Sequence, residues 1–220
     1  MNIFMWEEND KQNYKNLRKK NIGQICNDNF SAEIMKYASN LNYKSFLEIG
    51  TWNGLGSTMA FSTGFKNRED DYIFYSLECN KDKCADAAKL YTNNDKIHIL
   101  NEVIWNKQPD DFYKIFPQCL TNNMYKHWNE VDIINMKKCD LFLNRPNLPE
   151  IFDVILLDGG EFTTYHEFQI LKTKCKILML DDINVDKCKL IVKEIKSDKS
   201  WKIIKYDNVR NGYLIAKKLF

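Results

Sequence analysis

The sequence predicts an α/β fold in which a mostly parallel sheet lies between two layers of helices. Residues 152–157 and 175–180 are near-continuous apolar runs, the pattern of parallel strands buried on both faces. Residues 45–49 form a third apolar run, which a glycine-containing turn and a helical pattern follow. The chain has 220 residues, enough for one such core and few for two, so we expect one main domain.

The first elements follow from local patterns. Residues 1–28 are polar and rich in Lys and Asn, and we expect a solvated arm or helix there. From Phe30 onwards apolar residues recur at helical spacing, and Ser31 is a candidate N-cap. This helix leads into the strand at 45–49, and residues 56–63 are expected to form the helix after the turn.

The turn at residues 50–56 is the centre of the predicted binding site. Gly50, Gly54 and Gly56 let the backbone come close to a ligand or a helix. Their spacing is GxxxGxG and not the GxGxxG of dinucleotide sites, and residues 51–53 would crowd a pyrophosphate. The turn therefore favours a nucleoside without phosphates, and the alternative is an ordinary turn between a strand and a helix.

The second strand is expected at residues 72–80, with Glu78 near its end. In α/β nucleotide sites an acid at this position binds the ribose, because a carboxylate accepts two hydrogen bonds from a vicinal diol. Glu78 follows Gly54 by 24 positions, close to the spacing of about 20 expected for such a unit. Glu78 is therefore a predicted ribose ligand, and a surface position at the strand end is the alternative.

The middle of the chain is less regular. We expect a helix at 82–91 and a strand at 96–104, in which His98 is a packed core residue. Residues 105–150 are too long for a simple connection and rich in aromatic residues. We expect this segment to hold one or two helices that cover the sheet and partly line the pocket.

The predicted chemistry lies where the two apolar runs end. Asp158 follows the first run, and Asp181 and Asp182 follow the second. The carboxyl ends of parallel strands meet at one edge of a sheet, so we expect the three carboxylates to converge beside the glycine turn. Because such charges repel, a hard cation such as Mg²⁺ is a natural partner. The alternative is that the acids cap helices and turns.

Glu161, three residues after Asp158, is a predicted general base. A helix is expected at 185–195. The last two β-runs, 201–206 and 212–217, flank a turn with Asn-Gly and predict an antiparallel hairpin at the end of the sheet.

Composition excludes several classes of protein. The net charge is +2, which does not indicate a nucleic-acid partner. No signal-peptide pattern and no run of about 18 apolar residues occurs, so we expect neither secretion nor a membrane partner. The seven cysteines are odd in number and scattered, which indicates reduced thiols and a cytoplasmic location.

Five stretches together resemble a known family. EIGTWNGLGS at 48–57 is similar to the first motif of class I S-adenosylmethionine-dependent methyltransferases, which have a Rossmann-like, doubly wound seven-stranded sheet. YSLE at 75–78 resembles their second motif, and the terminal hairpin resembles their last two strands. LLDGGEFTTYHEF at 156–168 and LMLDD at 178–182 look like small-molecule O-methyltransferases, including enzymes that act on sugars and glycans and use a carboxylate-bound metal.

The resemblance implies a methyltransferase domain at 29–220 that transfers a methyl group to a hydroxyl of a sugar, glycan or small polyol. The implied cofactor is S-adenosylmethionine, and its predicted contacts are Glu48, Gly50, Thr51, Trp52, Asn53, Gly54, Ser57, Glu78 and Asp158. The implied metal ligands for Mg²⁺ are Asp158, Asp181 and Asp182, with Asp158 and Glu161 in catalysis. Related enzymes often carry a histidine at the position of Glu161.

Two other functions compete with this interpretation. The first is a nicotinamide-dependent oxidoreductase, against which the absence of GxGxxG argues. The second is a non-catalytic nucleoside-binding module, which would not need the acids at both strand ends. The expected partner is a small-molecule or glycan acceptor, with no nucleic acid, and a homo-oligomer is left open.

Overall fold

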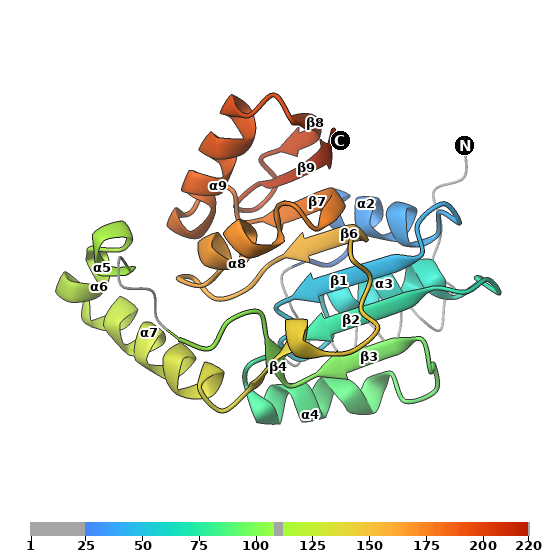
Figure 1. Ribbon diagram of the computed structural model, residues 1–220, viewed down its shortest axis with the longest axis horizontal. Helices are drawn as coiled ribbons and strands as arrows, with labels where there is room; N and C mark the ends of the chain where they lie inside the picture. The colour runs from blue at the N-terminus through green and yellow to red at the C-terminus, as the bar shows by residue number, and fades with distance from the viewer. Residues whose placement is uncertain (1–24, 108–111, 220) are drawn as a thin grey trace.

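A computed structural model describes residues 25–107 and 112–219 (Figure 1). Its main sheet has seven strands in the order β3-β2-β1-β6-β7-β9-β8. Strands β8 and β9 form an antiparallel hairpin, and β9 also lies antiparallel to β7. The other neighbouring strands are parallel. The predicted seven-stranded sheet with a terminal hairpin is therefore confirmed. The strands are β1 (Ser45–Ile49), β2 (Ile73–Leu77), β3 (Ile97–Leu100), β6 (Phe152–Leu157), β7 (Cys175–Asp181), β8 (Trp201–Asp207) and β9 (Tyr213–Lys218).

Helices cover both faces of the sheet. Alternate strand residues such as Phe46 and Val154 pack in one core cluster with α2 (Asn29–Ala38) and α3 (Ser57–Phe65). The residues between them, such as Leu47, pack in a second cluster with helices α8 and α9 on the opposite face. These two helices are α8 (Thr164–Leu171) and α9 (Asp186–Ser197). Two apolar faces explain why the strands read as continuous apolar runs.

The start of α2 differs from the prediction. Asp28, and not Ser31, is the N-cap, because its side chain accepts a hydrogen bond from the backbone N–H of Ser31 at 2.8 Å. The Ser31 hydroxyl oxygen in turn accepts from the backbone N–H of Asp28 at 3.0 Å. Ser31 is thus the third residue of the helix (position N3), and it forms a capping box with Asp28. In this motif each of the two side chains accepts a hydrogen bond from the backbone N–H of the other residue.

The predicted strand at 96–104 is interrupted. Strand β3 ends at Leu100, and β4 (Glu102–Val103) pairs instead with β5 (Asp140–Leu141) in a separate two-stranded sheet. Because β3 is an edge strand, His98 is only half-buried and stacks on Tyr75, so it is not the enclosed core residue predicted from the sequence. Helix α4 (Lys81–Leu90) connects β2 to β3.

Residues 105–150 cover less of the sheet than predicted. The described part contains α5 (Phe112–Ile115), α6 (Gln118–Thr121), α7 (Asn123–Met136) and the short 3₁₀ helix η1 (Phe142–Asn144). Figure 1 shows α5, α6 and the start of α7 extending away from the main sheet. In α7 only Asn129 and Met136 are buried. Met136, at the end of this helix, and Phe142 after it pack in the main core. The segment therefore contacts the sheet mainly through its C-terminal part.

The predicted arm at 1–28 lies almost entirely outside the described residues. Its last part belongs to the domain, because Ile25 is buried in the cluster of α2 and α3. Within the described ranges, no helix combines the length and the apolar character needed to cross a bilayer. All seven cysteines are described, and all are free thiols.

Candidate active site

The candidate site lies at the carboxyl ends of β1 and β6, where the strand order reverses direction. Ligands of open α/β sheets bind at such a switch point. Gly50, directly after β1, has φ +100°, and a Cβ atom built on it would lie 2.2 Å from the backbone oxygen of Asp158. A side chain is therefore excluded at residue 50. The glycine turn and the backbone of Asp158, directly after β6, therefore meet at one point of the sheet edge.

Glu78 holds the glycine turn in place. One oxygen of its carboxylate accepts a hydrogen bond from the backbone N–H of Trp52 at 2.7 Å, and the other accepts from Asn80 at 2.8 Å. Glu78 is almost fully buried, and this burial raises its pKa. A carboxylate oxygen has two lone pairs, so both oxygens keep an acceptor position for a ligand hydroxyl.

Glu48 lies beneath the turn, on the face of the sheet that α3 covers. It has no exposed surface, and burial raises its pKa. One oxygen accepts hydrogen bonds from the hydroxyls of Thr58 and Ser76, and Ser76 also contacts the hydroxyl of Thr51. The other oxygen, Oε1, has no hydrogen-bond partner among the described residues. Ser57 lies close enough to lower the pKa of Glu48 by a hydrogen bond.

The remaining predicted cofactor contacts line the same turn. Trp52 has a left-handed backbone, with φ 52°, and it is 52% exposed. The ammonium nitrogen of Lys83 lies over its ring, 4.4 Å from the ring centroid. Asn53 accepts from the backbone N–H of Leu55 through its side chain. Gly54 has φ +76°, and its carbonyl oxygen accepts from the hydroxyl of Tyr91. The predicted contacts thus belong to one structural unit, and their cofactor role stays a prediction.

A cavity of about 430 Å³ opens directly after Glu78. It lies beyond the ends of β2 and β3, next to the strand that carries the predicted ribose ligand. Polar groups predominate along it, and its lining residues are Cys79, Asn80, Lys81, Asp82, Asn101, Asn135 and Lys138. Asn101 also donates hydrogen bonds to the backbone oxygens of Glu78 and Cys79, which joins β2 to the point where β3 ends.

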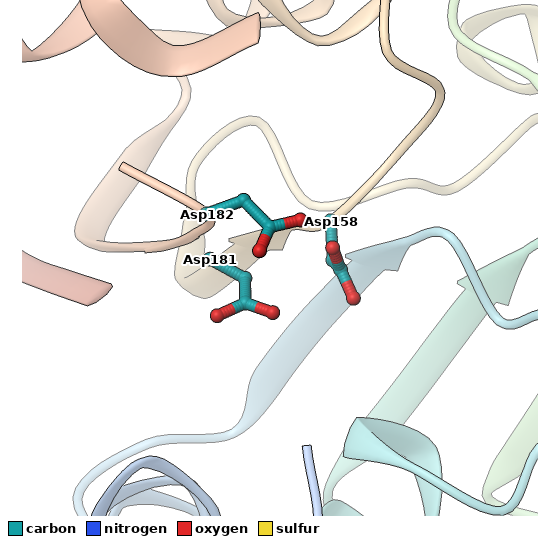
Figure 2. Close-up of side chains that lie close together, drawn as sticks. All are labelled: Asp158, Asp181 and Asp182. Carbon is teal, nitrogen blue, oxygen red and sulfur yellow. The ribbon is translucent and has the colours of Figure 1, made fainter. Parts of the chain in front are cut away.

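The three aspartates converge as the sequence predicted. Figure 2 shows Asp158, Asp181 and Asp182 close together at the ends of β6 and β7. One carboxylate oxygen from each lies within 4.8 Å of the others, a spacing that could hold a metal ion. Asp182 has the left-handed φ of 57°, so the chain turns sharply and two consecutive carboxylates reach the same region.

Two cations that the sequence reasoning missed contact this cluster. The ammonium of Lys187 lies 3.0 Å from Asp158 Oδ1 and 2.8 Å from Asp182 Oδ2. The guanidinium of Arg210 donates to both oxygens of Asp181, at 3.0 Å each. Neither contact was predictable from spacing, because Lys187 lies in the first turn of α9 and Arg210 lies in the hairpin turn.

The carboxylates differ in how far they are neutralised. Asn211 donates to Asp182 Oδ1 at 3.0 Å, so five of the six oxygens of the cluster have a partner. The sixth, Oδ2 of Asp158, accepts no hydrogen bond from a described residue. Burial raises the pKa of Asp158 to about 7, against the opposing effect of Lys187. Despite burial, Lys187 lowers the pKa of Asp182.

Glu161 lies half-buried in the loop after β6. Burial raises its pKa, and it has no hydrogen-bond partner in the described part of the chain. Glu167, in the first turn of α8, is a further buried acid that sequence reasoning missed. Its pKa is raised to about 8 by burial. The loop between β6 and α8 is thus bordered by several carboxyl groups that are costly to ionise.

Among the comparisons with known proteins, matches come from solved structures alone. No family model matches the sequence, and no curated protein does. Solved structures do match over nearly the whole chain. The O-methyltransferase from Bacillus cereus in complex with SAH is 11% identical, with a TM-score of 0.63 and coverage of 98% of this chain and 93% of that chain. TomG, an O-methyltransferase from Streptomyces achromogenes in complex with SAM, is 11% identical, with a TM-score of 0.60 and coverage of 98% and 92%.

The SAH-bound methyltransferase PaMTH1 from Podospora anserina is 12% identical, with a TM-score of 0.53 and coverage of 99% of each chain. Identities this low carry the fold and nothing finer. The described chain therefore has the Rossmann-like fold that these S-adenosylmethionine-dependent methyltransferases have.

Proposed function

We propose that this protein is an S-adenosylmethionine-dependent O-methyltransferase that acts on a hydroxyl group of a sugar, glycan or other small polyol. The observation that carries the proposal is the approach of Gly50 to the backbone of Asp158. It places the cofactor turn against the backbone of the residue whose carboxylate would act on the acceptor. The match to methyltransferase folds along almost the full chain supports the same activity.

The donor side fits a nucleoside without phosphates. Gly50 leaves room where any side chain would meet Asp158, and Glu78 presents acceptor positions for the two ribose hydroxyls. When bound, S-adenosylmethionine would supply an electrophilic methyl group on its sulfonium.

The acceptor side supplies a base. A hydroxyl attacks poorly while it keeps its proton, and the open Oδ2 of Asp158 is placed to accept that proton. Lys187 bonds only the other oxygen, Oδ1, and so keeps the carboxylate oriented. Glu161, three residues later, is the second candidate base. General-base catalysis is typically worth about 10² to 10⁴ in rate.

The chemistry of this rim supports the proposed acceptor class. Several carboxylates in one region can accept hydrogen bonds from neighbouring hydroxyls, and a polyol offers such groups in a row. The divalent ion predicted for Asp158, Asp181 and Asp182 stays a prediction.

Calorimetry and a transfer assay test the proposal together. Asp158→Asn should lower methyl transfer to a panel of sugars and polyols by about 10² to 10⁴ and leave the Kd for S-adenosylhomocysteine within about threefold. Glu161→Gln should have a smaller effect if Asp158 is the base. Full activity in Asp158→Asn would contradict the assignment, and the two variants serve as controls for each other.

The same calorimetry separates the rival functions. Wild-type protein that binds NADH and not S-adenosylhomocysteine would be an oxidoreductase. Protein that binds S-adenosylhomocysteine but methylates no hydroxyl compound would fit a nucleoside-binding module. Either outcome would overturn the proposed activity without changing the fold.

A further inference from the structure

The side chain of Lys187 is enclosed at the acid cluster. Lys187 is the second residue of α9, and only 4% of it is exposed. Its ammonium lies between Asp158 and Asp182, at 3.0 and 2.8 Å, with the backbone oxygen of Gly159 at 3.4 Å. An ammonium has three protons and no acceptor position, so these three oxygens use all of its donors.

The third carboxylate of the cluster is neutralised separately. Arg210 forms a two-point contact with Asp181, in the planar geometry that a guanidinium and a carboxylate favour. Its Nε atom also donates to Asp28 at 2.7 Å, which ties the hairpin turn to the start of α2. Asp181 is thus committed to a structural ion pair. A metal ion would have to compete with Arg210 for both of its oxygens.

From these contacts we infer that Lys187 is the resident cation of the acid cluster, and that the site works without a divalent metal ion. The inference rests on the proposed methyltransfer for its catalytic part. Lys187 is a positioning residue, since it holds Oδ1 of Asp158 and leaves Oδ2 free toward the acceptor. It also cancels the repulsion between Asp158 and Asp182.

The geometry explains why the ammonium of Lys187 and a Mg²⁺ ion would exclude each other. A Mg²⁺ ion needs oxygen ligands at about 2.0 to 2.1 Å, so it would have to sit among the same oxygens that the ammonium contacts. Like charges at such separations in a poorly solvated site repel strongly. Because Lys187 is enclosed, it cannot swing into solvent without movement of the start of α9. The carboxylates that predicted a metal site thus already have their counterions.

Binding of Mn²⁺ alone tests the inference, with free Mn²⁺ followed by electron paramagnetic resonance. Wild-type protein should show no stoichiometric binding. Lys187→Met keeps a side chain of similar length without the charge, and it should bind Mn²⁺ about tenfold or more tightly than the wild type, because Asp158 and Asp182 are left without a cation. The double variant Lys187→Met with Asp158→Asn should lose this gain.

A matched control comes from the same helix. Lys189 pairs with Asp186 on the exposed surface, and Lys189→Met should leave Mn²⁺ binding unchanged. Stoichiometric Mn²⁺ binding by the wild type that Asp182→Asn abolishes would overturn the inference, and so would loss of methyl transfer after EDTA treatment. These wild-type measurements hold even if Lys187→Met does not fold. Absence of S-adenosylhomocysteine binding would instead count against the proposed function, since the Mn²⁺ measurement needs no activity.

Discussion

The two edges of the main sheet both carry buried acids, and Asp153 at one edge and Asp158 at the other have pKa values shifted in opposite directions. At the edge where the strands begin, Asp153 accepts the backbone N–H groups of Lys44 at 2.6 Å and Ser45 at 3.1 Å, with Lys176 at 2.7 Å. Although burial opposes it, these donors lower the pKa of Asp153. At the edge where the strands end, burial raises the pKa of Asp158 to about 7.

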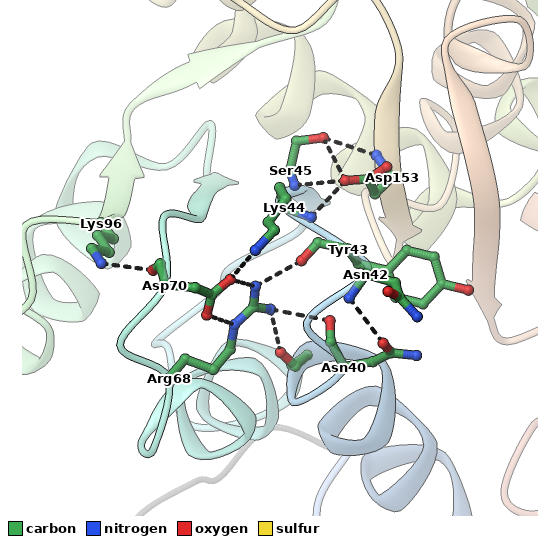
Figure 3. A network of polar contacts seen from close by, with 10 residues as sticks. Asn40, Asn42, Tyr43, Lys44, Ser45, Arg68, Asp70, Lys96 and Asp153 are labelled. Atoms are coloured by element: carbon green, nitrogen blue, oxygen red, sulfur yellow. Dashed lines mark hydrogen bonds and ion pairs between the residues drawn. The ribbon is translucent and has the colours of Figure 1, made fainter.

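The starting edge is organised around Arg68, as Figure 3 shows. Its side chain is 2% exposed and donates to both oxygens of Asp70, at 2.9 and 2.6 Å. It also donates to the backbone oxygens of Ala38 at 2.7 Å and Tyr43 at 2.8 Å, and it lies over the ring of Tyr72. One guanidinium thus joins the end of α2 to the connections before β1 and β2.

This difference separates stability from function within one sheet. Ionised carboxylates with several donors favour the folded state, as at Asp153. Carboxylates that are buried with too few donors oppose folding when they ionise, and such groups concentrate at functional sites. The comparison predicts that substitutions at the starting edge change unfolding and spare ligand binding. At the other edge, Asp158→Asn should change methyl transfer, and substitution of a buried acid should change how stability depends on pH.

The largest expected effect on stability is at Arg68. Arg68→Met should lower the free energy of unfolding by about 3 kcal/mol, because it leaves two backbone oxygens without this donor and leaves Asp70 with Lys44 as its remaining side-chain partner. Urea denaturation measures this change. Lys89→Met removes an exposed pair with Asp86 and should leave the free energy of unfolding almost unchanged, because solvent screens that pair. A large rise in the Kd for S-adenosylhomocysteine in folded Arg68→Met would break the comparison.

Sequence alone predicted the edge where the strands end better than it predicted the counterions there. Parallel strands place their last residues together, so the meeting of Asp158 with Asp181 followed from two apolar runs. The contacts of Lys187 and Arg210 depend on side-chain reach from a helix and a turn. Nothing in local periodicity reports such distances.

Two other differences have equally physical causes. The N-cap is Asp28 and not the predicted Ser31. Both residue types are good caps, so local sequence does not decide between them, and the path of the backbone does. The segment at 105–150 was predicted to cover the sheet because it is rich in aromatic residues. Its Phe112 and Phe116 pack instead with Phe162 in a small separate cluster.

A second prediction tests the edge where the strands end through pH. Glu167 is buried, and its Oε2 has no hydrogen-bond partner among the described residues. Its pKa is raised to about 8 by burial, with Asp132 adding to the rise and with a hydrogen bond from Thr163 and the charge of Lys187 opposing it. In the unfolded chain a glutamate has a pKa of about 4.3. Between these values the folded state holds a proton that the unfolded state has lost, so stability falls as pH rises.

Glu167→Gln removes this proton uptake. Relative to the variant, wild-type protein should lose stability progressively from about pH 4.3 to about pH 8 and then change no further. Urea unfolding at a series of pH values gives both curves. Parallel curves across that window would mean that Glu167 ionises in the folded state as easily as in water.

The smallest expected effect, at Asp153, should have the opposite sign. Its pKa is lowered in the folded state from the value of about 3.9 in an unfolded chain, so its ionised form stabilises the fold above that pH. Asp153→Asn should lower the free energy of unfolding at pH 7 by about 1 kcal/mol, since it removes charge-assisted hydrogen bonds. The deficit should shrink as pH falls below about 3.9, because the wild-type carboxylate then takes up its proton. A deficit that stays constant in acid would show that Asp153 contributes through its shape and not through its charge. Asp153 would then give no electrostatic contrast with Asp158.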